Sequence, residues 1–405
     1  MVISQKDGEW KSVRLGDYSQ VFRGGSPRPI QNYLTNSSQG INWIKIGDTG
    51  KDEKYITNTV ERIIPEGISK SREVFVGDLL LSNSMSFGRP YILEINGCIH
   101  DGWLVIQDYQ NSFDTQYLYY SLQTDSVKLQ FNNLAAGSGV HNLNKEIVSN
   151  IILNKPNKDE QVAIATVLSE IDSLIDNLEK LIEKKKNIKQ GAMQELLTGK
   201  RRLPGFTGGW TVKTIGRSGY LYKETINPQL SPLVLFYEYS MPAFDNGKQP
   251  IMKYGKDMHS NRIVISGKVL LFNKLNVRQK RIWLIDAEKE KSVCSSEFLA
   301  YYSDEIDLLY LNYLLNSSKI TKNFIDSSTG TSNSQQRITP DVFLGYSITV
   351  PSDIEEQTAI ASILSDMDNE IEELEKKLAK YRCIKQGMMS ELLTGHIRLT
   401  EKEDA

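Results

Sequence analysis

The sequence has few cysteines and histidines, no long apolar run and no excess of either charge. Its 405 residues include three cysteines, four histidines, and 48 basic against 50 acidic side chains. No stretch approaches the about 18 consecutive apolar residues of a membrane-spanning helix. The cysteines lie far apart and form no Cys-x-x-Cys pair, which argues against a disulfide framework and a zinc site. We therefore expect a globular protein of the reducing cytoplasm.

The sequence also lacks the common catalytic motifs. It contains no G-x-x-x-x-G-K-[ST] phosphate loop, no G-x-G-x-x-G, no G-x-S-x-G and no H-E-x-x-H. No Pro-Pro pair occurs, so the Asn/Asp-Pro-Pro-aromatic element of amino-methyltransferases is missing as well. The histidines have no ligand-like neighbours in the sequence. We predict no catalytic residue and no metal site, and an enzyme with an unrecognised site is the less favoured alternative.

What the sequence does contain is an internal repeat. The segment Glu160–Leu203 returns, without a gap, as Glu356–Leu399, an offset of 196 residues. From Gln161 to Leu203, 24 of 43 aligned positions are identical. Each half also opens near a tryptophan, Trp10 or Trp210. The chain therefore consists of two copies of one plan.

Each copy is predicted to hold a globular domain followed by a long helix. The globular parts show short β-prone runs separated by Gly, Pro, Asn and Ser, with helical pieces between them, which indicates an α+β fold. We place the two globular domains at residues 1–155 and 205–350. The helical regions are placed at 156–204 and 351–400.

Both helical regions have apolar residues at every third or fourth position, which is typical of a coiled coil. A single helix cannot bury such a stripe, so each needs a partner. Both helices are acidic first and basic later, and this order favours antiparallel pairing of the two copies. A solvated charged surface is the alternative explanation. The stripe residues are Ile164, Val167, Ile171, Leu174, Leu178, Leu181 and Ile188, widened by Leu168, Ile175 and Ile182, and Ile360, Ile363, Met367, Leu374, Tyr381 and Ile384.

Antiparallel helices that each follow a similar domain predict an approximate two-fold relation between the copies. Two similar domains related in this way match two half-sites on duplex DNA. The near-neutral total charge does not oppose this, because residues 205–350 sum to +4 (17 basic, 13 acidic) and residues 351–405 to −6 (7 basic, 13 acidic).

The repeated motifs EQ-x-x-IA, IKQG and ELLTG resemble the conserved regions of the specificity (S, HsdS-type) subunit of type I restriction–modification enzymes. The opening WKSVRLGD at Trp10–Asp17 is similar to that family too, and its counterpart at Trp210–Arg217 is weaker because it lacks LGD. The resemblance implies a non-catalytic subunit with two target recognition domains, each reading one half of a bipartite asymmetric DNA site. The helices would set the distance between the half-sites.

The resemblance also implies partners. The helices would bind two modification (methyltransferase) subunits and, through them, restriction subunits. S-adenosylmethionine, ATP and Mg²⁺ would be used by those subunits and none would be bound by this chain. A coiled-coil docking scaffold that binds no DNA is the alternative function.

Candidate DNA contacts are polar loop residues, because cations suit phosphates and amides suit base edges. Residues 261–285 of the second domain contain six basic and no acidic residues. An ordinary solvated turn is the alternative for every loop. In the first domain the candidates are Ser82, Asn83, Ser84, Ser86, Arg89, Ser138, His141, Asn142 and Asn144. In the second they are Asn273, Lys274, Asn276, Arg278, Lys280, Arg281, Thr331, Ser332, Asn333, Gln335 and Arg337.

Overall fold

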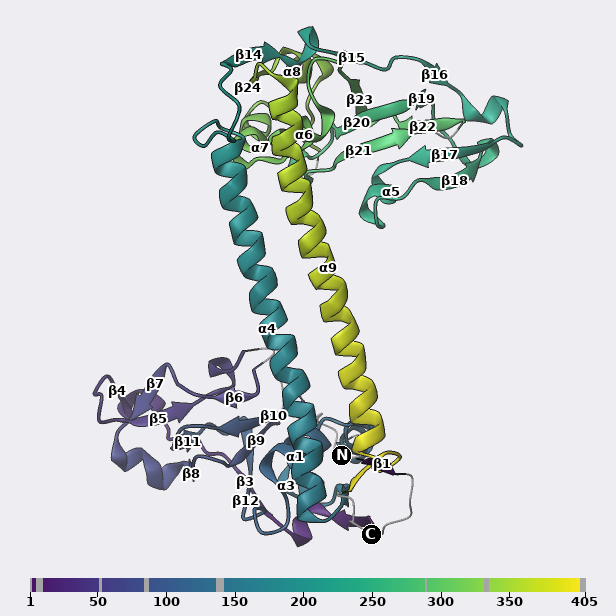
Figure 1. Cartoon of the computed structure of the whole chain (residues 1–405). Coiled ribbons are helices and arrows are strands. Elements are labelled where there is room, and N and C mark those ends of the chain that lie inside the picture. The colour runs from purple at the N-terminus through teal and green to yellow at the C-terminus, as the bar shows by residue number, and fades with distance from the viewer. Residues whose placement is uncertain are drawn as a thin grey trace. The chain divides into compact units, whose positions relative to one another are not determined.

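The computed structural model describes residues 2–4, 10–50, 53–83, 87–135, 142–287, 290–330 and 335–400. It divides into two compact units, which we call unit 1 (residues 1–179 and 377–405) and unit 2 (residues 180–376). Two long helices, α4 (Lys158–Leu196) and α9 (Ile354–Leu392), each contribute a part to each unit (Figure 1). The predicted α+β fold with two long helices is confirmed. Within the described residues, no helix is long and apolar enough to cross a membrane.

The globular domain of unit 1 is built on two five-stranded mixed sheets. One has the order β3-β12-β9-β10-β6 and the other the order β4-β7-β5-β11-β8. The central strand β9 is buried on both faces, and its sequence is accordingly three consecutive leucines followed by the buried Ser82. The strands of the first sheet are β3 (Gln20–Arg23), β12 (Trp103–Gln107), β9 (Leu79–Ser82), β10 (Pro90–Leu93) and β6 (Tyr55–Ile56). Those of the second are β4 (Leu34–Thr35), β7 (Glu61–Ile63), β5 (Ile41–Ile44), β11 (Gly97–Ile99) and β8 (Arg72–Val74).

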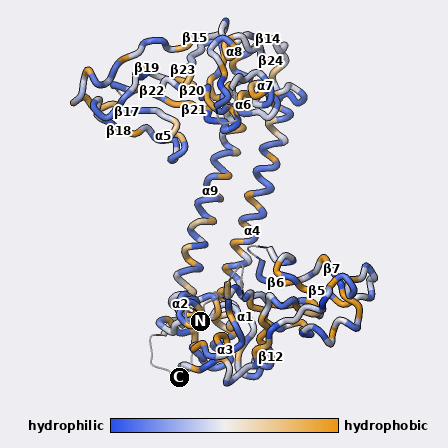
Figure 2. Tube along the Cα trace, turned by 180° about the vertical axis from the view of Figure 1, so that it is seen from behind, coloured by the Kyte–Doolittle hydropathy of each residue, from blue (hydrophilic) through white to orange (hydrophobic). Residues whose placement is uncertain are grey.

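Short helices and two small ribbons complete unit 1. Strand β2 pairs with β13 just before α4, and β1 pairs with β25 just after α9. Apolar residues gather inside the domain and beside the helices (Figure 2). These elements are β2 (Lys11–Arg14), β13 (Ile152–Lys155), β1 (Val2–Ser4), β25 (Arg398–Thr400), α1 (Thr115–Ser121), α2 (Asp125–Ala135) and α3 (Lys145–Ser149).

Unit 2 repeats this plan with one strand fewer in its first sheet. The orders are β15-β23-β20-β21 and β16-β19-β22-β17-β18, with a β14-β24 ribbon just before α9. The strands are β14 (Trp210–Thr214), β15 (Tyr220–Leu221), β16 (Thr225–Ile226), β17 (Leu235–Tyr239), β18 (Ile251–Tyr254), β19 (Arg262–Val264), β20 (Gly267–Asn273), β21 (Ile282–Ala287), β22 (Ser292–Ser295), β23 (Phe298–Tyr302) and β24 (Ser347–Pro351). The short helices are α5 (Met241–Asp245), α6 (Leu308–Asn316), α7 (Ser318–Asp326) and α8 (Pro340–Gly345).

The repeat extends into the strands, where sequence similarity is faint. Trp43 on β5 lies opposite Cys98 on the parallel strand β11. Tyr239 on β17 lies opposite Cys294 on β22 in the same way, and both residues are 196 positions later. Both cysteines are buried and unbridged. Equivalent register in both domains shows that they are copies of one fold.

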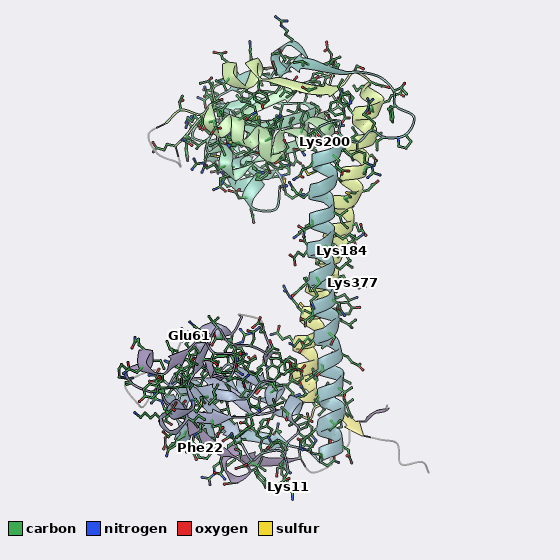
Figure 3. The ribbon with its side chains drawn as sticks, turned by 90° about the vertical axis from the view of Figure 1, so that its left-hand side faces the viewer. Lys11, Phe22, Glu61, Lys184, Lys200 and Lys377 are labelled. Atoms are coloured by element: carbon green, nitrogen blue, oxygen red, sulfur yellow. The ribbon has the colours of Figure 1, made fainter. Side chains whose placement is uncertain are left out.

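Within each unit the two long helices run antiparallel. In unit 1, Asp172 and Glu179 of α4 pair with Lys385 at 2.5 Å and with Arg382 at 2.6 Å. In unit 2, Lys185 pairs with Glu370 at 2.5 Å, and Lys189 pairs with Asp368. Residue numbers rise along one helix as they fall along the other, so the predicted antiparallel pairing is confirmed inside each unit. Other cations, such as Lys184 and Lys377, project into solvent (Figure 3).

The buried edge of α4 differs from the predicted stripe. Leu168, Ile175 and Ile182 are almost fully buried, whereas Leu174, Leu181 and Ile188 keep 47, 37 and 47% of their surface exposed. The helix has apolar residues over a wider arc than one partner helix can cover. The stripe as predicted was therefore wrong at these three exposed positions, whereas Ile164, Ile171 and Leu178 of the same stripe are buried together with the residues expected only to widen it.

In each unit a buried carboxylate links the start of one long helix to the segment that follows the end of the other. Glu160, at the start of α4, accepts hydrogen bonds from Arg398 Nε at 2.6 Å and Nη2 at 2.7 Å, and from Trp10 Nε1 at 3.2 Å. Glu356, at the start of α9, is held by Arg202 Nε and Nη2 at 2.6 and 2.7 Å. Each carboxylate also lies at a helix N-terminus, where negative charge is favourable. The arginine that neutralises each one follows the end of the other long helix.

A polar triad attaches each globular domain to both long helices. In unit 1, Tyr120 of α1 donates to Asp172 at 2.6 Å, and Lys385 pairs with the same carboxylate. In unit 2, Tyr313 of α6 donates to Asp368 at 2.8 Å, and Lys189 pairs with it. Helices α1 and α6 thereby have a fixed orientation on the long helices.

Unit 1 adds a lysine to its triad. Lys54 donates to the Tyr120 hydroxyl at 2.8 Å and lies 4.4 Å from the centre of its ring. Burial lowers the pKa of Lys54 to about 8, against the opposing effect of Asp172. This lysine therefore carries its charge at a desolvation cost.

We predict that Arg398→Ala lowers the free energy of unfolding of unit 1 by about 3 kcal/mol, because it leaves a buried carboxylate without its cation. Urea titration with hydrogen exchange on unit 1 measures the change. Lys128→Ala is the matched control, since Lys128 and Asp125 are both exposed and such a pair contributes less than about 1 kcal/mol. Equal losses in both variants would contradict the importance of the buried carboxylate.

Candidate nucleic-acid interface

The two candidate loops of unit 2 lie side by side. Ile338 N donates to the Lys274 carbonyl at 2.9 Å, and Asn276 N donates to the Gln336 carbonyl at 2.8 Å. Leu275 and Arg337 form an antiparallel bridge between them. The structure therefore brings together segments that are about sixty residues apart in the sequence. Thr331, Ser332 and Asn333 lie outside the described residues.

The candidate loops of unit 1 are joined by equivalent backbone hydrogen bonds. Leu143 N donates to the Asn83 carbonyl at 3.0 Å, as Ile338 does to Lys274. Ser82 N donates to the Arg89 carbonyl at 3.1 Å, as Asn273 N does to that of Arg281 at 3.0 Å. Arg89 and Arg281 are therefore equivalent residues at the return of the loop. Ser84, Ser86, Ser138 and His141 lie outside the described residues.

Three of the candidates are buried and shape the loops. Asn83 Nδ2 donates to the Asp101 carbonyl at 3.0 Å, and the Ser82 hydroxyl accepts from Arg89 N at 3.2 Å. Asn273 Oδ1 accepts from Leu275 N at 2.7 Å. In this conformation these side chains are not exposed to a ligand. Their role in contact with DNA stays a prediction that would require the loops to open.

The remaining described candidates reach the surface to different extents. Asn142, Asn144, Arg278, Lys280, Gln335 and Arg337 are exposed, and Arg89, Lys274, Asn276 and Arg281 are half-buried. Asn144 caps α3 by accepting from Ile147 N at 2.8 Å. Arg337 forms an ion pair with Glu297 at 3.2 Å.

The loop after β20 presents Arg278 at its tip. Asn276 and Lys280, on either side of it, both have left-handed backbone conformations, with φ of 52° and 47°. Such conformations are strained for residues other than glycine and are concentrated at functional sites. Arg278 itself is exposed and has no hydrogen-bond or ion-pair partner among the described residues. Its guanidinium donors are therefore available to a ligand.

Arg281 differs from Arg278 because its guanidinium is already occupied. It donates from Nε and Nη2 to the two carboxylate oxygens of Asp245, both at 2.8 Å. These hydrogen bonds hold the pKa of Asp245 below its usual value. Arg281 therefore joins the loop to α5 before any ligand binds.

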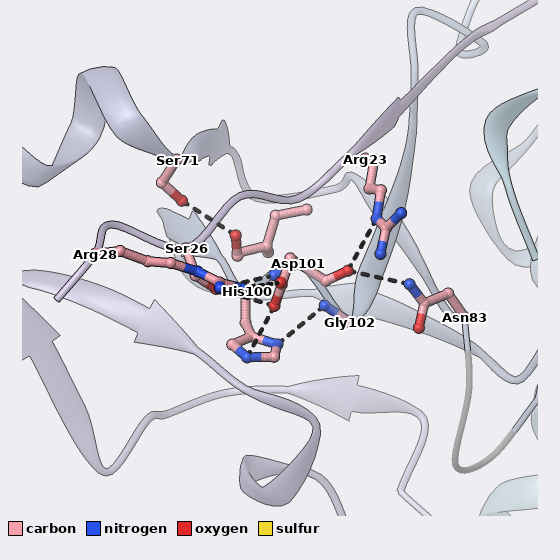
Figure 4. A network of polar contacts seen from close by, with 9 residues as sticks. Arg23, Ser26, Arg28, Ser71, Asn83, His100, Asp101 and Gly102 are labelled. Atoms are coloured by element: carbon pink, nitrogen blue, oxygen red, sulfur yellow. Dashed lines mark hydrogen bonds and ion pairs between the residues drawn. The ribbon is translucent and has the colours of Figure 1, made fainter. Parts of the chain in front are cut away.

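Sequence reasoning missed a polar network in unit 1 centred on Asp101 (Figure 4). Its carboxylate accepts from Ser26 Oγ at 3.0 Å and pairs with His100 Nε2 at 3.0 Å and Arg28 Nη2 at 3.4 Å. Its carbonyl accepts from Arg23 Nε at 3.2 Å and from Asn83 Nδ2 at 3.0 Å. Ser26 and Arg28 belong to the sequence GGSPRP at Gly24–Pro29, and nothing in the sequence relates this segment to a residue more than 70 positions later.

The polar loops of the two units point to a protein that recognises a ligand rather than to one built around a metal centre. Each unit carries convergent loops of cations, amides and hydroxyls on a repeated α+β domain, and the described residues include no cluster of three or more metal-ligating side chains. The protein-family model described as the type I restriction modification DNA specificity domain matches residues 7–190 and 244–380 of the sequence. This is most of the chain, and the chain belongs to that family of specificity subunits.

Curated relatives and solved structures agree with this assignment. The chain is 26% identical over 423 residues to the type I restriction enzyme MjaVIII specificity subunit of Methanocaldococcus jannaschii, covering 96% of this chain and 93% of that one. It is 25% identical to the putative MjaX specificity subunit of the same organism, with 96 and 94% covered. The S subunit of a type I system from M. genitalium has a similar fold, with a TM-score of 0.60, 14% identity, and 95 and 96% covered. A structure from work on complex assembly of a type I R-M system also has a similar fold, with a TM-score of 0.57 and 14% identity. The match covers 96% of this chain and 99% of that one.

We predict that Arg281→Ala lowers the stability of unit 2 by about 1 kcal/mol, whereas Arg278→Ala leaves it unchanged. The reason is that only Arg281 makes a two-point ion pair within the fold. Thermal unfolding of the two variants measures the difference. A larger loss for Arg278→Ala than for Arg281→Ala would show that the loop is held in another way.

Proposed function

We propose that this specificity subunit is non-catalytic and binds a bipartite asymmetric DNA site, with each target recognition domain contacting one half-site. The observation that carries the proposal is the matched pair of loop junctions, Asn83 with Leu143 and Lys274 with Ile338. Loops with equivalent backbones but different side chains are suited to contact two half-sites of different DNA sequence. Two identical loops would instead suit a symmetric site.

The side chains of the second domain fit duplex DNA. Arg278 and Lys280 are exposed cations, which suit phosphates, and Gln335 is an exposed amide, which suits a base edge. The domain's charge of +4 favours association with a polyanion. In unit 1, Arg89, Asn142 and Asn144 provide a smaller set at the equivalent place.

We further propose that the long helices bind two modification subunits and, through them, restriction subunits. In unit 1, a hollow of about 700 Å³ runs along α4 and is lined by Tyr55, Val162 and Leu174, among others. Val162 and Leu174 keep 46 and 47% of their surface exposed and line the same hollow, which supports a docking face for a partner here. In this proposal S-adenosylmethionine, ATP and Mg²⁺ are bound by those subunits and the protein functions in the cytoplasm.

The experiment that tests the proposal is selection of duplex DNA from a random library by the subunit together with its modification subunits. The expected result is enrichment of two unlike sequences separated by a spacer of fixed length. A docking scaffold predicts capture of the modification subunits without any enriched sequence. An enzyme complete in itself predicts methylation or cleavage by the chain alone, and either result would overturn the proposal.

We predict that inserting one turn into both helices, four residues after Lys180 and four after Lys377, changes the preferred spacer while both half-sites stay the same. One turn adds about 6 Å of helix. The same DNA selection measures the spacer. Insertion into only one helix is the control, because it breaks the antiparallel register and should reduce stability. A spacer that stays unchanged in the double insertion would contradict a ruler role for the helices.

We predict that Arg278→Ala weakens specific DNA binding by about 1–3 kcal/mol if Arg278 reads a guanine. If it contacts a phosphate instead, the loss is uniform over sequences and the salt dependence becomes shallower. Titration of the selected duplex at several salt concentrations distinguishes the two contacts. Unchanged affinity and unchanged salt dependence would remove Arg278 from the interface.

A further inference from the structure

A hollow of about 300 Å³ in unit 1 is lined in part by Ser26, Arg28, His100 and Asp101. These four residues belong to the network of polar contacts that Figure 4 shows. The lining of the hollow also includes Lys45 and Glu61, together with the buried Trp43. Lys45 is already paired with Glu61 at 2.7 Å, so its charge is largely balanced. The hollow therefore presents hydrogen-bond donors and acceptors together. None of these residues lies in the loops that the sequence marked as candidates.

Asp101 is held in one orientation. His100 Nδ1 accepts a hydrogen bond from Gly102 N at 2.9 Å, which assigns the ring proton to Nε2. Nε2 then donates to Asp101 Oδ1, which also accepts from Ser26 Oγ. Partial burial raises the pKa of Asp101, but the Ser26 hydrogen bond and the nearby His100, Arg28 and Arg23 outweigh it and keep this pKa below its usual value. The carboxylate is thus held in place by Ser26 and His100.

Arg28 makes only one contact with this fixed carboxylate. Its Nη2 lies 3.4 Å from Asp101 Oδ2, and 82% of its side chain is exposed. Two arginines of unit 2 are bound more completely. Arg281 makes two bonds of 2.8 Å to Asp245, and Arg262 holds the buried Glu238 at 2.8 and 2.6 Å with only 12% of its side chain exposed. Arg28 thus lies beside a carboxylate, and no other hydrogen-bond or ion-pair partner takes up its remaining donors among the residues that the structure describes.

The chemistry of the hollow favours a base edge over a phosphate. A phosphate site would place cations without a carboxylate, since Asp101 would repel the ligand. The major-groove edge of guanine presents two acceptors, O6 and N7, which match the fork of an arginine. A carboxylate behind the fork limits its rotation and so reduces the entropy lost on binding.

We propose that Arg28 donates to O6 and N7 of one guanine in the half-site read by the first recognition domain, with Asp101 as its positioning residue. This inference rests on the proposed function. It identifies one base of the half-site and a recognition residue outside the candidate loops. Ser26 and His100 support Arg28 indirectly, through Asp101.

The test is DNA selection from a random duplex library by the subunit with its modification subunits, for the natural chain, Arg28→Ala and Arg28→Lys. We expect Arg28→Ala to lose guanine preference at one position of one half-site, by about 5- to 150-fold, with the other positions unchanged. Arg28→Lys should not restore it, because an ammonium lacks the fork. A uniform loss that Arg28→Lys restores, with a shallower salt dependence, would overturn the inference in favour of a phosphate contact.

Asp101→Asn tests the positioning role. We expect a smaller loss of preference at the same base, and no further loss in Arg28→Ala/Asp101→Asn than in Arg28→Ala alone. Additive losses, or a loss at another base, would overturn that role. Arg14→Ala is the matched control in unit 1, because Arg14 also pairs with a carboxylate, Asp17, and is 54% exposed. Its selected sequence should be unchanged.

The failures can be told apart. If the natural chain enriches no sequence, the proposed function fails. If it enriches a bipartite site that Arg28→Ala reads unchanged, only the inference about Arg28 fails.

Discussion

The structure depends on a buried carboxylate at the start of each long helix and on the arginine that neutralises it. A buried carboxylate without a cation is strongly destabilising, and for Glu160 and Glu356 the cation follows the end of the other long helix. Apolar residues at the end of each long helix likewise pack against the other copy of the repeat. Leu392 and Leu399 pack into the core of the first domain, and Leu196 into that of the second. Each unit is therefore completed by a segment from the other copy of the repeat.

This arrangement explains why the net charge is a poor guide to DNA binding. The acidic first half of α9 has its carboxylates next to lysines of α4, as in the pairs Glu370 with Lys185 and Glu375 with Lys186. Three acidic residues of α9, Asp368, Glu370 and Glu375, thus serve the pairing of the two helices. The balance of −2 for the whole chain combines this acidic helix with a basic recognition domain, so it describes neither surface.

The same backbone frame supports different polar chemistry in the two domains. Arg89 and Arg281 occupy equivalent positions, yet Arg281 is bound to Asp245, whereas Arg89 lies 5.4 Å from the centre of the Tyr91 ring. Whether an arginine contributes to the fold or stays available to a ligand is decided by the carboxylate within its reach. Arg278 has no carboxylate partner among the described residues and Arg28 makes a single 3.4 Å contact with Asp101, whereas Arg262 and Arg281 are each held by two bonds.

The sequence by itself determined the duplication, the α+β class, the two long helices and their antiparallel sense. These follow from local periodicity, from charge order and from identity at a fixed offset, which need no knowledge of distant contacts. Only the tertiary structure decided which apolar edge of α4 is covered, and that Ser82, Asn83 and Asn273 are buried within loops expected to be exposed. It alone joined Arg28 to Asp101, because burial and ion pairing depend on residues that the fold brings together from far apart in the chain.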